Sequence, residues 1–182
     1  MGCSFTEEII EKTIAFHGHD CPGLTIGIRA AEYILLEFRG ADSENLVCVT
    51  ETDMCAVDGI QFLTGCTIGK GNLIHRDFGK AAFSIFDRKK GAAKRFVLRK
   101  DAKEMNGKSP ENKTEMIQVL LEKGLGQLFD VQELATNPPR SARVLQSMVC
   151  QQCAEETMES RTRRFDGQTL CIPCFEKIDQ KR

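Results

Sequence analysis

The residues best suited to chemistry lie in one short loop, FHGHDCPG, at positions 16–23. Imidazole nitrogen and thiolate sulfur are the ligands that zinc and related ions prefer. Alternate side chains of an extended loop share a face, so His17, His19 and Cys21 are expected to converge. Pro22 fits the first turn of a helix, whose positive end favours the thiolate form of Cys21. The loop therefore predicts a metal site, most simply a zinc site, in which Cys21 is a ligand or a nucleophile.

A second group of polar and thiol side chains lies on an expected helix over 56–65 and on the glycine-rich loop 66–72. Its members are Cys55, Asp58, Gln61, Cys66, Thr67, Lys70 and Asn72. Cys55, Asp58 and Lys70 are candidates for catalysis beside Cys21, because the first two share a helical stripe and Lys70 can turn inward. Gln61, Thr67 and Asn72 are candidates for binding a ligand or cofactor.

Cys66 is a further candidate ligand for the core ion. The alternative for Cys55 and Cys66 is that either is a small buried hydrophobe, and the sequence does not decide between them. The loop 66–72 lacks the P-loop spacing, but its amides and Lys70 suit a small anionic or carbonyl ligand.

The C-terminal region contains two C-x-x-C pairs separated by seventeen residues. The four cysteines are Cys150, Cys153, Cys171 and Cys174. This is the spacing of structural zinc sites, in which two knuckles complete a tetrahedron of thiolates. The insert is expected to form a β-hairpin that turns at Asp166-Gly167. An iron–sulfur cluster is the alternative occupant.

The elements that must position these groups follow from periodicity. Helices are expected over 5–16, 24–38, 56–65 and 109–126, a further helical turn over 130–136, and strands over 46–51, 72–79, 81–88 and 95–100. This order favours an α+β fold, a mixed β-sheet flanked by helices, over a doubly wound sheet. Asn137-Pro138-Pro139-Arg140 marks a boundary between a core domain over 1–140 and a small zinc-finger domain over 141–182.

Composition excludes some classes of protein. The net charge of −1 is against a globally basic nucleic-acid-binding protein. No apolar run reaches the length of about 20 residues that spans a bilayer. Nine cysteines, four of them at zinc spacing, are typical of a reducing compartment, so we expect a cytoplasmic protein.

Three stretches, FHGHDCPGLTIGIRAAEY, CAVDGIQFLTGCTIGKGN and DFGKAAFSIFDR, together resemble the family of the E subunit of formylmethanofuran dehydrogenase. The C-terminal cysteines resemble the treble-clef zinc finger that some members carry. The resemblance implies a thioredoxin-like α+β core with a metal-binding active site. Matching positions place that site at His17, His19 and Cys21, with Cys55, Asp58, Gln61 and Cys66 as neighbours.

The family is linked to a molybdenum or tungsten oxidoreductase of methanogenesis and also occurs in other anaerobes. The resemblance implies an accessory role in such an enzyme, as a homodimer or together with the enzyme's other polypeptides. Two alternatives remain open: a thiol redox or metal-delivery module, and a regulator that binds nucleic acid through Arg161, Arg163 and Arg164 of the finger.

Overall fold

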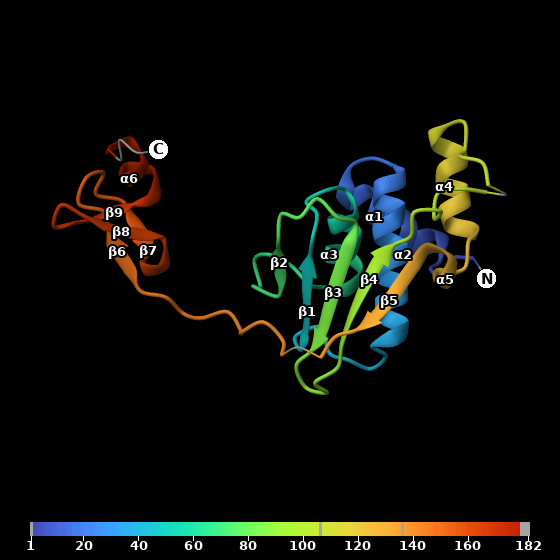
Figure 1. Cartoon of the computed structure of the whole chain (residues 1–182), viewed down its shortest axis with the longest axis horizontal. Coiled ribbons are helices and arrows are strands. Elements are labelled where there is room, and N and C mark those ends of the chain that lie inside the picture. Colours follow the sequence, from blue (N-terminus) through green and yellow to red (C-terminus); the bar gives the residue numbers. More distant parts are fainter. Residues whose placement is uncertain (1, 106, 136, 179–182) are drawn as a thin grey trace. The chain divides into compact units, whose positions relative to one another are not determined.

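The computed structural model describes residues 2–105, 107–135 and 137–178. It divides into two compact units, residues 1–141 and 142–182. The first unit is a five-stranded mixed sheet with helices packed against it, and the second is a small unit built around four cysteines (Figure 1). The predicted α+β class, with a mixed sheet and a cysteine-rich C-terminal tail, is confirmed.

The first unit contains the sheet in the order β2-β1-β3-β4-β5. Its strands are β1 (Leu46–Thr50), β2 (Leu73–His75), β3 (Ala82–Asp87), β4 (Ala93–Leu98) and β5 (Phe129–Glu133). Its helices are α1 (Glu7–His17), α2 (Pro22–Glu37), α3 (Ala56–Thr64), α4 (Lys113–Glu122) and α5 (Leu125–Leu128). Only β1 and β2 pair in parallel, and the other neighbours are antiparallel.

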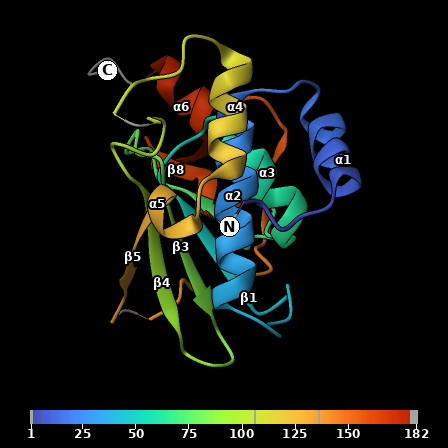
Figure 2. The ribbon, with the colours of Figure 1, turned by 90° about the vertical axis from the view of Figure 1, so that its right-hand side faces the viewer.

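The core lies between one face of the sheet and helices α2 and α3 (Figures 1 and 2). Strand β1 shows why both faces are apolar, because its side chains alternate with a period of two. Leu46 and Cys48 pack toward the helices, whereas Val47 and Val49 join a smaller cluster on the other face. Helix α1 covers α2 and α3 from outside through Ile10 and Ile14.

Strand β5 differs from the expected further turn of helix over 130–136. Phe129 and Val131 alternate with polar residues and pair with Leu98 and Phe96 of β4. The helical prediction was therefore wrong where the structure describes this segment. The period of two, completed by a long-range strand partner, decided the local structure.

Helices α2 and α3 approach closely and run in the same direction. A Cβ added at Gly27 would lie 2.2 Å from the carbonyl oxygen of Ala56, and one at Gly59 would lie 2.9 Å from the backbone of Gly27. Near the helix starts, a Cβ at Gly23 would lie 3.1 Å from the Cβ of Cys55. Because the helices are parallel, Cys21 and Cys55, which precede them, lie at the same end of the pair.

Capping residues fix where the loop 17–21 begins and ends. The hydroxyl of Thr6 accepts the amide of Ile9 at the start of α1, as predicted. Helix α1 ends after His17 because Gly18 has a φ of 93° and donates its N–H to Ile14. That turn brings the chain back, so the rings of His17 and His19 lie 4.5 Å apart.

The second unit is made of short strands and one helix. They are β6 (Ser147–Val149), β7 (Glu156–Met158), the 3-10 turn η1 (Glu159–Arg161), β8 (Thr162–Phe165), β9 (Gln168–Cys171) and α6 (Ile172–Ile178). The predicted hairpin is confirmed as β8–β9. Asp166 and Gly167 both have positive φ, 45° and 74°, as a tight two-residue turn requires.

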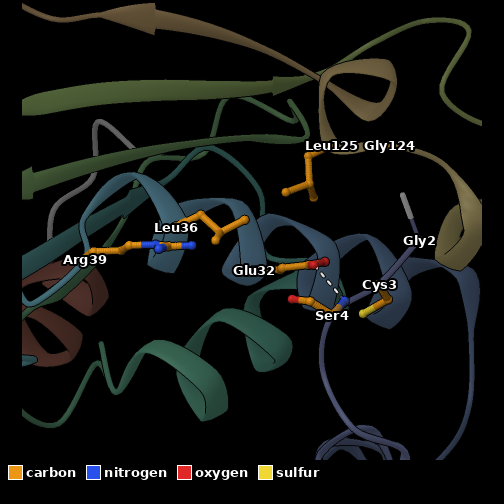
Figure 3. A pocket seen from close by; sticks show the side chains of 8 residues that line it. All are labelled: Gly2, Cys3, Ser4, Glu32, Leu36, Arg39, Gly124 and Leu125. Atoms are coloured by element: carbon orange, nitrogen blue, oxygen red, sulfur yellow. Dashed lines mark hydrogen bonds between the residues drawn. The ribbon is translucent and has the colours of Figure 1, made fainter.

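The N-terminal segment is fastened across α2 by a buried polar group. The amide of Ser4 donates to Glu32, which pairs with the fully buried Arg29. Beside it lies a cavity of about 530 Å³ lined by Gly2–Ser4, Glu32, Leu36, Arg39, Gly124 and Leu125 (Figure 3). None of the histidines or cysteines of the loop 17–21 lines this cavity. None of the helices in the described ranges combines the length and the apolar character that crossing a bilayer requires.

A candidate metal centre at two helix starts

Four potential metal ligands meet in the first unit: His17, His19, Cys21 and Cys55. One donor atom from each lies within 4.8 Å of all the others. The sulfur of Cys21 lies 3.8 Å from Nε2 of His17. Two donors on one tetrahedral zinc lie about 3.3–3.8 Å apart, given bond lengths of about 2.0–2.3 Å. The donors are therefore nearly at binding distance, and the predicted convergence of the loop is present.

Asp58 orients the ring of His17. Its Oδ2 lies 2.7 Å from Nδ1 of His17, whose side chain is only 9% exposed. The carboxylate favours the tautomer with the proton on Nδ1, which leaves the lone pair of Nε2 directed toward Cys21. A carboxylate behind a histidine in this way is the usual support of a metal-bound imidazole.

The two thiols differ in their surroundings. Cys21 is buried and caps α2, because its sulfur accepts the amide of Leu24 at 3.3 Å. Burial and contact with the Cys21 thiol raise the pKa of Cys55. Two adjacent thiols in a partly buried place do not both ionise without a cation, so the donor set fits a divalent ion that would stabilise both thiolates.

His19 is the exposed member of the group. Its described contact is with the ring of His17, at a centroid distance of 4.5 Å and an interplanar angle of 39°. It therefore lies on the solvent side of the centre, while the other three donors lie against α2 and α3.

Cys66 and Lys70 lie away from this centre. Cys66 is fully buried in the core, where its thiol donates to the carbonyl of Leu46 at 3.7 Å and burial raises its pKa. Lys70 is exposed near Gly65, at the opposite end of α3 from Cys55. The structure therefore does not bring either residue to the histidines.

Three other candidates have structural partners. The side chain of Asn72 accepts the amide of Thr67 and donates to the carbonyls of Ser43 and Leu46. The hydroxyl of Thr67 accepts the amide of Lys70. Thr67 and Asn72 thus shape the loop after α3.

Gln61 is the only one of these three candidates that touches the centre's surroundings. Its amide donates to Asp58 at 3.4 Å, and its oxygen accepts the amide of Ile68. The residues that sequence reasoning missed are Gly23 and Gly59, which let the helix starts meet. Glycines at spacings of four, as in Gly23 and Gly27, were the available signal.

The second unit brings together Cys150, Cys153, Cys171 and Cys174, again with all four sulfurs within 4.8 Å. The sulfurs of Cys153 and Cys171 lie 3.9 Å apart. Backbone N–H groups lower the pKa of Cys150 to about 6, whereas contact with the Cys171 thiol raises that of Cys174 to about 12. Four thiols at one point require a cation before all can ionise, which fits a structural zinc.

Family models match both units. The model described as "FmdE, Molybdenum formylmethanofuran dehydrogenase operon" matches residues 16–135, more than half of the chain. The model described as "Prokaryotic dksA/traR C4-type zinc finger" matches residues 144–180. The predicted C-terminal four-cysteine zinc finger is thus confirmed, and its four ligands lie within the matched range.

Two individual proteins are similar over most of the chain. A protein of Archaeoglobus fulgidus named "Probable S-adenosyl-L-methionine-binding protein" is 29% identical over 188 residues, which cover 87% of this chain and 50% of that protein. The chain thus spans about half the length of this relative. The crystal structure of an FmdE-like protein of tungsten formylmethanofuran dehydrogenase, from Syntrophus aciditrophicus, superposes with a TM-score of 0.73. It is 24% identical, and the match covers 97% of this chain and 95% of the other, which establishes a shared fold.

Proposed function

The chain belongs to the FmdE family, and from that premise we propose that its core binds one transition-metal ion, zinc in the first place, at a centre that receives a small ligand. His17, His19, Cys21 and Cys55 would hold the ion. When bound, such an ion acts as a Lewis acid on a coordinated oxygen or sulfur. The protein's own residues hold the donors, and burial keeps water from the inner side.

The observation that supports this function most directly is the hydrogen bond between Asp58 and His17. A histidine with no ligand to bind has no need for a carboxylate that fixes its tautomer. Here the free Nε2 faces a sulfur at 3.8 Å instead of solvent or an apolar side chain. The arrangement therefore favours a metal ligand over a histidine with a purely structural role.

The test is the metal content of the full-length protein, determined by mass spectrometry after purification without chelator. We expect two equivalents per chain, one in the finger and one in the core. Replacing Cys21 and Cys55 together by Ala should remove one equivalent and leave the finger's. A double variant that retains two equivalents would overturn the proposal.

Cys66→Ala is the matched control. It removes a cysteine of the same unit that lies outside the centre. A folded Cys66→Ala protein should retain both equivalents. Loss of the core equivalent in this control would show that removal of any thiol from the core, and not loss of a ligand, releases the ion.

A second candidate function is thiol redox chemistry, favoured by the contact between the Cys21 and Cys55 thiols. Oxidation would join the two sulfurs and pass two protons and two electrons to an external disulfide. The raised pKa of Cys55 makes it a poor thiolate without a metal, which is why we place this function second. Thiol counts on metal-free protein in glutathione buffers of graded potential separate the two functions, because a pair that stays reduced excludes the shuttle.

A further inference from the structure

We propose that His19 is the exchangeable ligand of the core ion and that an uncharged donor takes its place; this inference rests on the core metal site proposed above. Removal of His19 leaves one imidazole and two thiolates, His17, Cys21 and Cys55. One histidine, two cysteines and an open position form a donor set used by catalytic zinc. The chain thus combines a closed resting centre with a reactive open one.

Three of the four donors are held by the fold. The carboxylate of Asp58 holds His17 at 2.7 Å. The N–H of Leu24 holds the sulfur of Cys21 at the start of α2. Cys55 stands at the start of α3, packed against Gly23 so closely that a Cβ there would lie 3.1 Å away. Each donor would need a local rearrangement of the protein to leave the ion.

His19 has no comparable support. Among the described residues, no hydrogen bond to its ring is present, and its contact is the tilted ring of His17. Its side chain is exposed, and it follows Gly18, whose φ of 93° marks the end of α1. Since supporting hydrogen bonds fix the orientation of metal-bound imidazoles, the unsupported ring is the one that an incoming ligand displaces at least cost.

The charge around the centre indicates which ligand would enter. A divalent ion with two thiolates has no net charge, and Asp58 adds a negative charge behind His17. Two further carboxylates, Asp20 and Asp53, are exposed beside the ligating cysteines in sequence. The loop cation Lys70 stands at the far end of α3. An anion would therefore be repelled, which favours a neutral carbonyl, alcohol, thiol or imidazole-like donor.

The test uses the full chain with zinc or cobalt and three single variants. Competition with a chromogenic chelator measures the zinc affinity of each equivalent. We expect His17→Ala to lose the core equivalent and His19→Ala to keep it, with affinity reduced less than about 10-fold. His75→Ala, which replaces the remaining and exposed histidine, is the control and should change neither affinity.

Cobalt spectra then identify the incoming ligand. Since all variants share the same finger, the difference spectrum between treated and untreated protein reports on the core. We expect millimolar imidazole to change the visible spectrum of His19→Ala and to restore its zinc affinity, whereas thiocyanate at equal ionic strength has a far smaller effect. Circular dichroism shows whether each variant is folded.

The outcomes separate this inference from the proposed function. A wild-type chain with only the finger's ion refutes the core site itself, and the exchange with it. A core ion that His19→Ala loses as completely as His17→Ala overturns the exchange alone and leaves a closed four-ligand centre. Thiocyanate that binds as tightly as imidazole overturns the preference for an uncharged ligand.

Discussion

At the scale of single residues, Asp58 is the side chain whose loss should be felt most specifically at the core ion. It touches His17 through one oxygen and Gln61 through the other, and it is not among the clustered ligands. We expect Asp58→Ala to weaken core zinc binding about 10–100-fold, because His17 loses its orientation and part of its basicity. Chelator competition on the full chain measures this loss.

Asp53→Ala is the matched control for this prediction. Asp53 is an exposed carboxylate just before Cys55 and carries a similar charge. Its replacement should change core affinity less than about threefold, since only screened charge is lost. Equal losses in the two variants would mean that Asp58 acts by general electrostatics and not through the imidazole.

Glu51 and Arg95 form a pair on the sheet whose contribution depends on pH. Their side chains are 8% and 21% exposed, and the hydrogen bond from Arg95 lowers the pKa of Glu51. A carboxyl whose folded pKa is depressed stabilises the fold above its ordinary pKa and loses that contribution as pH falls through the folded value. Arg95→Gln should therefore cost about 1–2 kcal/mol at pH 7, and this difference should vanish below about pH 4.

Thermal unfolding from pH 3 to pH 8 checks the prediction. Arg99→Gln is the comparison, because Arg99 pairs with Asp101 and Asp130 at a more exposed position. That change should cost less than about 0.5 kcal/mol. A constant difference between the wild type and Arg95→Gln across the pH range would show that Arg95 acts by packing alone.

Several site residues could be predicted from local spacing alone. His17, His19 and Cys21 alternate within five positions, so any extended path brings them together. Cys55 and Cys66 flank the same helix, and only the parallel packing of α3 on α2 decides which of them reaches the loop. A single sequence does not contain the direction of that packing, which is why the two remained alternatives.

At the scale of secondary-structure elements, the contact between α2 and α3 positions the whole centre. A Cβ at Gly27 would lie 2.2 Å from Ala56 O, so Gly27→Ala must push α3 outward and carry Cys55 with it. We expect destabilisation by about 3 kcal/mol and loss of the core ion while the finger's ion remains. Chemical denaturation and metal analysis measure the two effects.

Gly126→Ala is the control for this contact. A Cβ at Gly126, in α5, would have no atom within 4 Å. Its replacement should change stability by less than about 1 kcal/mol and leave both ions bound. A Gly27→Ala protein with normal stability and two ions would contradict the role that we assign to the helix contact.

Element prediction succeeded where local signals and tertiary context agreed. The capped helices and the buried strands were found, since Thr6 and Gly18 are local signals and β1 is a short apolar run. Strand β5 was mistaken for helix because its partner β4 lies about thirty residues earlier in the chain. Pairing over such a distance is determined by the assembled sheet and not by the segment itself.

At the scale of the whole molecule, the two units should respond differently to loss of metal. The finger buries only a small cluster, Cys150, Leu170, Cys171 and Cys174, so zinc supplies much of its folding free energy. The core has a separate apolar interior between sheet and helices. We therefore expect a strong chelator to unfold residues 147–178 while the sheet of the first unit stays folded.

Limited trypsin digestion checks this expectation. Cleavage after Arg163 and Arg164 in the β8–β9 hairpin should accelerate at least about tenfold with chelator, whereas sites within β3 and β4 stay protected. Cys171→Ser should show the same cleavage without any chelator and keep the core ion. Simultaneous cleavage of both units would indicate that they unfold cooperatively.

The parallel start of α2 and α3 also has a consequence for the order of events during biosynthesis. Residues 17–21 leave the ribosome well before Cys55, and α3 docks on α2 only after Gly59 has been made. Until then the nascent chain can offer an ion no more than three donors on an unanchored loop. Tight loading must therefore wait for tertiary docking, so that occupancy of the core distinguishes finished molecules from incomplete ones.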